Sequence, residues 1–292
     1  MSKVWLITGS SRGLGLALAK AVLAAGDRLV ATARQPKQLA SLVEQYPERA
    51  LAVALDVTDS ASARAAVAQA VAHFGRLDVL VNNAGYANVS SIEDLPEDDF
   101  RAQMETNFFG VLNVTRAALP VLRKQGSGHV IQISSLGGRL GSAGLSAYQS
   151  AKWAVGGLTE VLAREVGPLG VKVTIVEPGG FRTDWAGSSM HIEPYNDAYA
   201  GTVGQMVAYR SSPETPRGDP AKAAQAILTL AALAEPPLRL LLGTDAVFLA
   251  KAVLQRRAAE DDQWQALSSS TDFDGSLDFA ETPLGKLLSG RS

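Results

Sequence analysis

Two side chains spaced four residues apart, Tyr148 and Lys152, have the chemistry needed to move a proton. On a helix this spacing puts both on one face, one turn apart. A tyrosine with its ordinary pKa of about 10 is a weak base, but a nearby ammonium and the positive end of a helix both favour the phenolate. An ordinary surface tyrosine and lysine is the alternative interpretation, because Tyr-x-x-x-Lys is a common pattern.

The elements that position this pair are a strand, a glycine-rich loop and a helix. The apolar run His129 to Ile133 predicts a buried strand, and two serines follow it. Ser146 and Gln149 stand three apart, as in a capping box, so we expect the helix to begin near Ser146. Tyr148 would then lie in its first turn, and a serine hydroxyl at the strand end would hold a carbonyl oxygen beside the phenol.

The whole chain alternates strand-like and helix-like segments. The apolar runs that predict strands are Val4 to Ile7, Leu29 to Ala33, Leu51 to Leu55, Val79 to Val81, His129 to Ile133, Val171 to Val176 and Leu238 to Leu242. The amphipathic stretches that predict helices are Gly13 to Ala25, Pro36 to Tyr46, Ser60 to His73, Pro96 to Lys124, Ser146 to Val166 and Pro220 to Ala234. This alternation predicts an α/β fold, a doubly wound parallel sheet of seven strands with helices on both faces. Ligands of such sheets bind beyond the carboxyl ends of the strands.

Composition excludes several classes of function. The 292 residues are 47% hydrophobic with a formal net charge of -2, which gives no electrostatic case for nucleic acid or an anionic membrane. Cysteine is absent, so disulfides and thiolate chemistry are excluded, and the three scattered histidines predict no metal site. No apolar run is long enough to span a bilayer and no signal peptide opens the chain, so we expect a cytoplasmic protein.

A glycine-rich turn follows the first predicted strand. Gly9, Gly13 and Gly15 have the spacing Gly-x-x-x-Gly-x-Gly after Thr8, and a helix begins at once. Glycines allow a pyrophosphate to approach the backbone closely, and the start of a helix offers it free N–H groups. The turn therefore predicts a dinucleotide site, with a glycine turn that binds no ligand as the alternative.

Five motifs in order make the prediction specific. They are Thr8-Gly-x-x-x-Gly-x-Gly15, Asn82-Asn83-Ala84-Gly85, Ser135, Tyr148-x-x-x-Lys152 and Pro178-Gly179. The chain from about Lys3 to Gly243 resembles the short-chain dehydrogenase/reductase family in its compact, single-domain branch, and more weakly its 17β-hydroxysteroid and retinol dehydrogenase-like members. The resemblance implies a Rossmann-type domain over residues 1–243, with a substrate loop over about 180–219 and a C-terminal helical extension and tail over 244–292.

The resemblance also implies catalytic roles at matching positions. Tyr148 matches the general acid/base, Lys152 the residue that holds the nicotinamide ribose and lowers the tyrosine pKa, and Ser135 the donor to the substrate oxygen. Asn107 matches the asparagine that bends its helix and keeps a water in the proton path. Ser134 is the competing hydroxyl, and we prefer Ser135 because it precedes Tyr148 by thirteen residues as in the family.

Further positions match the family's cofactor contacts. Asp56 and Val57 match the adenine contacts, Phe181 lies near the nicotinamide, and Thr183 matches the threonine that meets its amide. Asp59 and Ser60 are alternative caps of the next helix, which leaves Asp56 for the ligand. The full set of expected cofactor-binding residues is Gly9, Ser11, Arg12, Gly13, Leu14, Gly15, Arg34, Asp56, Val57, Asn83, Ala84, Gly85, Tyr148, Lys152, Pro178, Gly179, Phe181 and Thr183.

The choice of nicotinamide cofactor depends on the end of the second strand. An NAD site usually has an acid there for the ribose 2′-hydroxyl, but this chain reads Thr32-Ala33-Arg34 with no acid before Glu44. Arg34 and Arg12 can clasp a 2′-phosphate with charge-assisted hydrogen bonds. We therefore expect NADP(H), with use of NAD(H) also open; two solvated surface arginines are the alternative.

The substrate side is less specific. Residues 180–219 are expected to run irregularly as a lid, and their aromatic and methionine side chains, Trp185 among them, favour an apolar or ring-bearing carbonyl or alcohol. We expect a helix over Thr244 to Trp264 and a polar tail from Ser268, either packed loosely or covering the substrate site or a neighbouring subunit. The family commonly dimerises through the helices around Asn107 and Tyr148, which implies a homodimer or homotetramer.

Together these features predict an NADP(H)-dependent oxidoreductase that passes hydride between nicotinamide and a carbonyl or alcohol carbon. One alternative is a catalytically idle NADP-binding regulator, against which the complete set of catalytic residues argues. A nucleotide-sugar epimerase is the other alternative, but its glycine spacing differs and it needs a longer C-terminal domain.

Overall fold

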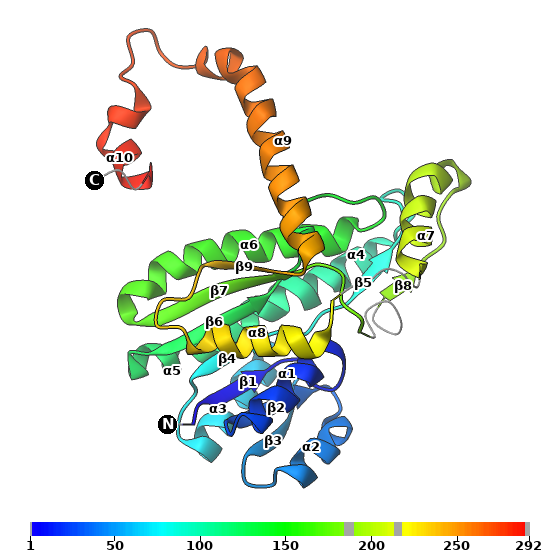
Figure 1. The fold of residues 1–292 in the computed structure, drawn as a ribbon, viewed down its shortest axis with the longest axis vertical. Helices are drawn as coiled ribbons and strands as arrows, with labels where there is room; N and C mark the ends of the chain where they lie inside the picture. Colours follow the sequence, from blue (N-terminus) through cyan, green and yellow to red (C-terminus); the bar gives the residue numbers. More distant parts are fainter. Residues whose placement is uncertain (1, 184–189, 213–217, 290–292) are drawn as a thin grey trace. The chain divides into compact units, whose positions relative to one another are not determined.

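A parallel sheet of seven strands forms the centre of the protein (Figure 1). The computed structural model describes residues 2–183, 190–212 and 218–289. The strands lie in the order β3-β2-β1-β4-β6-β7-β9, and every neighbouring pair is parallel. Their bounds are β1 Val4–Ile7, β2 Arg28–Ala33, β3 Ala50–Ala54, β4 Val79–Asn82, β6 Gly128–Ile133, β7 Val171–Pro178 and β9 Arg239–Leu242. The expected seven-stranded parallel fold is confirmed.

Helices cover both faces of this sheet (Figure 1). They are α1 Gly13–Ala24, α2 Ala40–Gln45, α3 Ser60–Phe74, α4 Glu97–Met104, α5 Gly110–Gln125, α6 Ser146–Val166 and α8 Pro220–Ala232. Side chains alternate along β1, so Trp5 and Ile7 pack in a core with α1, α2 and α8, whereas Leu6 packs in a second core with α3, α5 and α6. Burial on both faces explains why the strands are mostly apolar.

Caps in the sequence set the ends of several helices. Asp59 accepts a hydrogen bond from the Ala61 backbone N–H at the start of α3, as expected, and Asp219 caps α8 in the same way. A left-handed glycine ends α3 at Gly75 (φ 78°) and α5 at Gly126 (φ 65°). Such caps satisfy backbone groups that the helix itself leaves unpaired.

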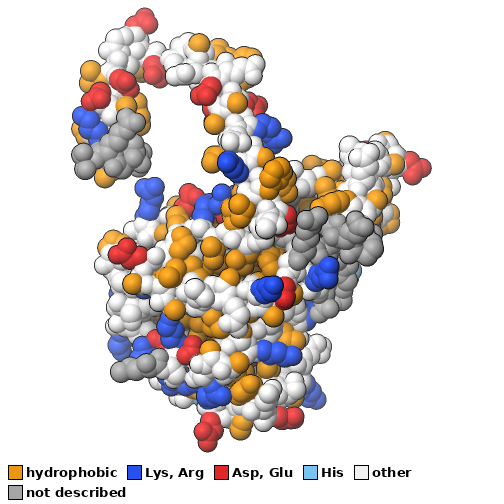
Figure 2. All heavy atoms as spheres, viewed as in Figure 1, with side chains coloured by type: hydrophobic (Ala, Val, Ile, Leu, Met, Phe, Trp, Pro, Cys, Tyr) orange, Lys and Arg blue, Asp and Glu red, His pale blue; other side chains and the backbone are white. Residues whose placement is uncertain are grey.

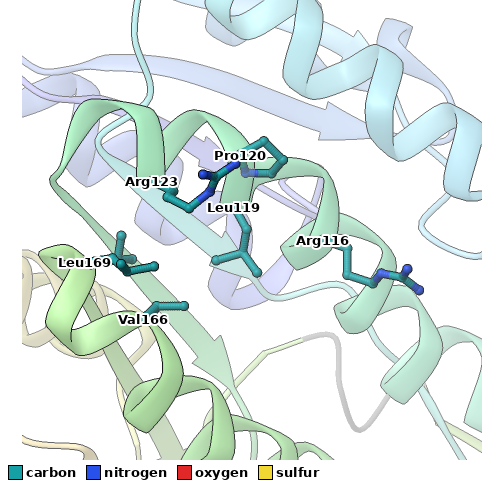
Figure 3. Close-up of a pocket in the computed structure, with 7 residues that line it drawn as sticks. Arg116, Leu119, Pro120, Arg123, Val166 and Leu169 are labelled. Carbon is teal, nitrogen blue, oxygen red and sulfur yellow. The ribbon is translucent and has the colours of Figure 1, made fainter.

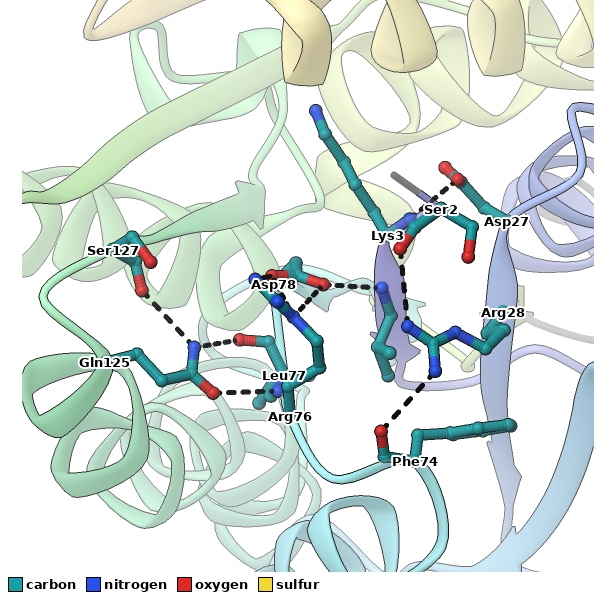
Figure 4. Close-up of polar contacts among 11 residues, drawn as sticks. Ser2, Lys3, Asp27, Arg28, Phe74, Arg76, Leu77, Asp78, Gln125 and Ser127 are labelled. Atoms are coloured by element: carbon teal, nitrogen blue, oxygen red, sulfur yellow. Dashed lines mark hydrogen bonds and ion pairs between the residues drawn. The ribbon is translucent and has the colours of Figure 1, made fainter.

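Polar side chains bind the amino ends of the central strands together, at the edge of the sheet opposite the glycine turn (Figure 4). The Asp78 carboxylate accepts from the Val4 N–H at 2.8 Å and pairs with Arg76 at 2.6 Å. The Gln125 amide accepts from the Leu77 N–H and donates to the Leu77 carbonyl. These bonds fix the register of β1 and β4 at their starts, so the strands reach the opposite edge together.

The stretch Pro96 to Lys124 is helical, and a π-helical turn, Glu105–Phe109, joins α4 to α5 at Asn107, where the resemblance implied a bend. One local expectation about helices was wrong. Helix α6 begins at Ser146 as expected, but without a capping box. The buried Ser146 Oγ has no hydrogen-bond partner among the described residues, and Gln149 instead bonds the Ser142 N–H and hydroxyl.

The segment after β7 is more ordered than an irregular loop. Strand β8, Met190–Ile192, pairs in parallel with β5, Ala87–Val89, and a 3-10 turn (Asp197–Tyr199) and a π turn (Ala200–Gly204) lead into α7, Gln205–Ser211. These elements are too short to leave a periodic pattern in the sequence. Trp185, which was expected in this loop, lies outside the described residues.

Two compact units divide the chain, Met1–Ala250 and Lys251–Ser292. Helix α9 runs over Thr244–Ser269, five residues further than expected. The segment from Ser268 onward also contains a 3-10 turn, Phe279–Glu281, and helix α10, Pro283–Ser289. No helix among the described residues has both the length and the apolar character that a membrane crossing requires.

Candidate active site

The glycine turn after β1 is packed too closely for side chains. Gly9 (φ 67°) and Gly13 (φ 56°) adopt left-handed backbone conformations that favour glycine. A Cβ on Gly15 would overlap the Gly9 carbonyl and lie 2.5 Å from the Asn83 Nδ2. The turn therefore keeps an exposed backbone at the start of α1, where N–H groups can bind a phosphate.

The end of β4 is bonded directly to this turn. Thr8 Oγ1 accepts from the backbone N–H groups of Asn83 (2.8 Å) and Ala84 (2.9 Å). The Asn83 side chain donates to the carbonyls of Thr8 (3.0 Å) and Gly9 (3.2 Å). A second hydroxyl, which the sequence did not single out, is buried at Ser10 and donates to the Ile7 carbonyl. Two of the expected cofactor segments thus form one rigid edge.

Tyr148 and Lys152 lie together on the first turns of α6, as their spacing predicted. The Lys152 Nζ stands 5.7 Å from the centre of the Tyr148 ring. Both side chains are buried, at 8% and 4% exposure. Lys152 Nζ donates to the Ile133 carbonyl at the end of β6, at 2.8 Å. Burial lowers the pKa of the Lys152 ammonium from 10.5 to about 8, because desolvation disfavours the charged form.

The two serines after β6 have different partners. Ser134 is buried, and its hydroxyl donates to the Lys152 carbonyl at 3.3 Å. Ser135 is half-buried, and its Oγ accepts from the Gly137 N–H at 3.0 Å. The Ser135 hydroxyl hydrogen is therefore not used in that bond, which favours Ser135 over Ser134 as a donor to substrate.

Asn107 is fully buried in the π-helical turn, and its side chain forms hydrogen bonds with the backbone that follows β4. Its Oδ1 accepts from the Tyr86 N–H at 3.0 Å, and its Nδ2 donates to the Tyr86 carbonyl at 2.8 Å. A Cβ on Gly85 would lie 2.6 Å from Asn107 Oδ1 and 3.8 Å from Lys152 Nζ. Gly85 therefore lies between the two side chains, and only a glycine fits there.

The side expected to hold the adenosine is open. Arg12 precedes α1 and Arg34 follows β2, and both are exposed. The pKa of the Tyr86 hydroxyl is raised by burial and further by the Asp99 carboxylate, whereas the Arg34 guanidinium lowers it. Because Arg34 acts on Tyr86, which follows β4, Arg34 lies near the end of that strand. Both arginines thus lie at the surface, on the side of the sheet where a bound ribose is expected.

The segment after β3, where the adenine contacts are expected, is hydrogen-bonded to a side chain of α5. Asp56 is exposed, and its Oδ1 accepts from the Thr58 N–H and hydroxyl. Val57 is buried against Gly110. Asn113, which the sequence did not single out, donates to the carbonyls of Val57 and Thr58 at 3.0 and 3.3 Å. One Asp56 oxygen is occupied by the turn, so the other is the one that can accept from a base.

The loop after β7 returns to the glycine turn. The Thr183 Cβ lies 3.6 Å from where a Gly13 Cβ would be. Phe181 forms an isolated bridge with Gly218, and its ring covers the Gly218 Cα. The expected residues Pro178 and Gly179 begin this loop, at the carboxyl end of β7.

Asp245, on the first turn of α9, is a residue that the motifs of the sequence did not reveal. Its Oδ2 accepts from the Gly180 N–H at 2.7 Å. A Cβ on Gly179 would lie 2.5 Å from the Asp245 Cγ, and one on Gly243 would lie 2.5 Å from its Oδ1. The carboxylate is thus enclosed by three glycines. Only Gly243 is close to Asp245 in the sequence, so no local pattern could have indicated this contact.

A buried carboxylate, Glu177, ties the Ser135 loop to the end of the sheet. Arg139 donates to its Oε2 (2.5 and 2.9 Å), and Arg239 donates to its Oε1 at 2.6 Å. Arg239 also pairs with Glu160 at 2.6 Å. Two cations on one carboxylate compensate its loss of hydration. No pattern in the sequence predicts this contact.

An apolar cluster lies beside the tyrosine. Tyr148 packs with Leu145 and Val203, and partly buried side chains complete the cluster: Met190, Tyr195, Tyr199 and Val207. Residues 190–207 of the segment after β7 therefore share one apolar cluster with Tyr148. Their position is fixed by polar bonds, including Tyr199 hydroxyl to Glu93 (2.6 Å) and Asn196 N–H to Asp94 (2.8 Å).

A separate groove of about 300 Å³ lies between α5 and α6, away from the tyrosine (Figure 3). Its lining is apolar, with an arginine at two positions. The residues are Arg116, Leu119, Pro120, Arg123, Val166, Leu169 and Val171. They lie around the end of α6 and the start of β7, so this groove is not part of the candidate active site.

Comparisons with known proteins agree with this geometry. A family model described as short chain dehydrogenase matches residues 3–193. Oxidoreductase BOA17 from Botryotinia fuckeliana (strain B05.10) is 53% identical over 270 residues, covering 92% of this chain and 98% of the relative. The crystal structure of a short-chain dehydrogenase from Streptomyces avermitilis is 46% identical, with a TM-score of 0.88 over 94% of this chain and 100% of its own. A Burkholderia cenocepacia J2315 short-chain dehydrogenase in complex with NADP is 26% identical, with a TM-score of 0.72 over 90% and 97%.

Proposed function

Because the chain belongs to the short-chain dehydrogenase family, we propose that it is an NADP(H)-dependent oxidoreductase acting on a carbonyl or alcohol carbon. The observation that carries this proposal is the buried pair of Tyr148 and Lys152, in which Lys152 bonds the Ile133 carbonyl at the end of β6, two residues before Ser135. The glycines of the turn and Gly85 pack where no side chain fits, and the turn leads directly into the N-terminus of α1, where backbone N–H groups can bind a pyrophosphate. When bound, the nicotinamide supplies or accepts the hydride.

In reduction, the Tyr148 hydroxyl gives its proton to the substrate oxygen. The Ser135 hydroxyl donates a hydrogen bond to the same oxygen and holds it in place. The Lys152 ammonium stabilises the phenolate that forms, because an adjacent positive charge favours the charged form. Asn107 keeps Gly85 and Tyr86 in position beside Lys152 through its two bonds to the Tyr86 backbone. Oxidation runs through the same groups in reverse.

The proposed substrate is apolar or ring-bearing. Its support is the apolar cluster of Leu145, Val203 and the lid side chains next to Tyr148. Turnover of NADPH with a panel of ketones and aldehydes of graded size tests the function. We expect the highest kcat/KM with the more apolar members. NADPH binding without turnover on any carbonyl would support the idle regulator, and turnover of nucleotide sugars would support the epimerase.

The cofactor proposal depends on Arg34. Changing Arg34→Ala is expected to raise the KM for NADPH about 10- to 100-fold and leave that for NADH nearly unchanged, because a charged hydrogen bond contributes about 1.5–3 kcal/mol. The support is the exposed guanidinium after β2, where no acid is present, and a relative whose structure contains NADP. Arg164→Ala, an exposed arginine near the far end of α6, is the matched control. An equal change for both cofactors would contradict a 2′-phosphate contact.

Asp245 is proposed to position the nicotinamide loop. Replacing Asp245→Ala is expected to raise the KM for NADPH roughly 10-fold with a smaller change in kcat, because the Gly180 N–H loses its acceptor. Asp245→Asn keeps an acceptor oxygen and should recover most of the affinity. A loss of thermal stability with an unchanged KM would show that the carboxylate only supports the fold.

A homo-oligomer is proposed as well, through the outer faces of α5 and α6. Large apolar side chains are exposed on α6, at Trp153 (42%) and Val161 (54%). Two more are exposed in the adjoining turns, at Phe109 before α5 (41%) and Leu169 after α6 (43%). Leu169 also lines the apolar groove between the two helices (Figure 3). Such surfaces mark protein interfaces. Molecular mass in solution, compared with that of Val161→Glu, tests the proposal.

A further inference from the structure

The C-terminal unit, Lys251–Ser292, exposes the large apolar side chains that it carries. Among its described residues no large hydrophobic side chain is buried. The exposed fractions are 67% at Leu254, 54% at Trp264 and 64% at Leu267. Figure 2 shows hydrophobic side chains on the surface of this part of the chain. Large exposed apolar side chains that lie close together on a surface are typical of sites that bind another protein.

One face of α9 carries a stripe with a defined charge pattern. Successive residues of a helix are rotated by about 100°, so Val253, Arg256, Glu260, Trp264 and Leu267 fall within roughly 80° of one another. The stripe is apolar at both ends and carries one cation and one anion in its middle. Both charged side chains are exposed, and neither forms an ion pair within the described part of the chain.

The charges of this stripe are complementary to those of the same stripe on a second, antiparallel copy of the helix. Suppose that two copies of α9 run antiparallel and are related by a two-fold axis that passes beside residue 258 of each. Arg256 of one copy then lies opposite Glu260 of the other, and the symmetry repeats this ion pair, so the interface contains two. In the same register Val253 lies opposite Gln263 and next to Trp264 of the second copy. Interfaces between identical chains related by a two-fold axis are self-complementary in this way.

Other arrangements of the same helix bring like charges together. A parallel pair would set Arg256 against Arg256 and Glu260 against Glu260. An antiparallel pair shifted to position 260 would set Glu260 against itself. Like charges across an interface are unfavourable, so the charge pattern selects one register and one direction.

We propose that α9 pairs antiparallel with α9 of a second copy of this chain through Val253, Arg256, Glu260, Trp264 and Leu267. The burial of two indole rings contributes most of the apolar area, and the two ion pairs set the register. This interface is separate from the proposed α5–α6 interface. Two different two-fold interfaces in one assembly give a closed tetramer when their axes are perpendicular and intersect.

Charge reversal tests the pairing on the full chain. Glu260→Arg puts a second guanidinium opposite Arg256 at both contacts, so the molecular mass from sedimentation equilibrium is expected to fall by half. Arg256→Glu should do the same. The double variant Arg256→Glu/Glu260→Arg restores opposite charges and should restore the mass. Asp262→Arg makes the same change of charge on the opposite side of the helix, and its mass should equal that of the unchanged protein.

A second test uses the absence of cysteine from the chain. Val253→Cys and Gln263→Cys, co-expressed and mildly oxidised, should form a disulfide-linked heterodimer, whereas neither variant alone should. Linked dimers of Val253→Cys alone would indicate parallel pairing and overturn the proposal. It is also overturned if the double charge variant stays at the mass of Glu260→Arg, or if all masses are equal. Equal masses would assign the stripe to the chain's own body or to a different protein.

Discussion

Replacing Tyr148 with phenylalanine is expected to lower kcat for NADPH-dependent carbonyl reduction by about 10²- to 10⁴-fold. The change removes the only atom that is proposed to give a proton to the substrate oxygen, while the ring still fills its place among Leu145 and Val203. NADPH binding should change little, because the glycine turn and the loop after β7 remain intact. Steady-state kinetics and NADPH titration by fluorescence measure the two effects separately.

Tyr46→Phe provides the matched control for that loss. Tyr46 lies at the end of α2, where its ring packs against the Arg49 guanidinium on the other side of the sheet from α6. The variant should keep the kcat of the unchanged protein. If Tyr148→Phe also kept its kcat, the phenol would not be the acid, and the proposed chemistry would be wrong. Loss of NADPH binding in that variant would instead indicate a structural role.

Replacing Lys152 with methionine is expected to abolish activity and at the same time stabilise the fold by about 1–2 kcal/mol at pH 7. Burial lowers the pKa of Lys152 to about 8, a shift that corresponds to roughly 3 kcal/mol against the charged form. Methionine removes that cost and fills a similar volume. The Ile133 carbonyl loses its donor, which offsets about 1 kcal/mol of the gain.

The pH dependence identifies the source of this stabilisation. Between pH 8 and 10.5 the unfolded chain holds the Lys152 proton more tightly than the folded chain, so the stability of the unchanged protein rises with pH in that window. The advantage of Lys152→Met should therefore be full below pH 8 and shrink above it. Urea unfolding at a series of pH values measures this.

Lys172→Met is the control for the lysine prediction, because it makes the same substitution at an exposed lysine, which donates to the Leu233 carbonyl at 3.1 Å. Its effect on stability should be nearly the same at pH 7 and at pH 10. An advantage of Lys152→Met that is the same at pH 7 and pH 10 would show that packing, rather than removal of a buried charge, is its cause. A destabilised variant would contradict the proposed cost directly.

Much of the fold could be predicted because each strand is buried on both faces and each helix has a wide apolar side. Those patterns are local, so the sheet, the start of α6 and the cap at Asp59 were accessible from the sequence. The capping box at Ser146 failed because Gln149 is drawn to Ser142 across the preceding loop. Composition and spacing carry no information about such a competing tertiary contact.

The contacts that the sequence did not predict join segments far apart in the chain. Asp245 reaches the loop after β7, and Arg139 and Arg239 share one carboxylate at Glu177. Strands β5 and β8 have three residues each and exist only because they pair with one another. The chemistry of the motifs was visible in the sequence, whereas the residues that hold the motifs in place depend on the folded topology.

The position of Asp245 has a consequence for the synthesis of this protein on the ribosome. The strands nearest the glycine turn come early in the chain, and the N-terminal part can begin to form while later segments are still being translated. The acceptor for the Gly180 N–H follows only after β9, 65 residues later. Nascent chains that end before Asp245 would therefore have most strands of the sheet but would lack the bond that holds the loop after β7. If this loop contacts the nicotinamide, as proposed, the cofactor site would be completed late in synthesis.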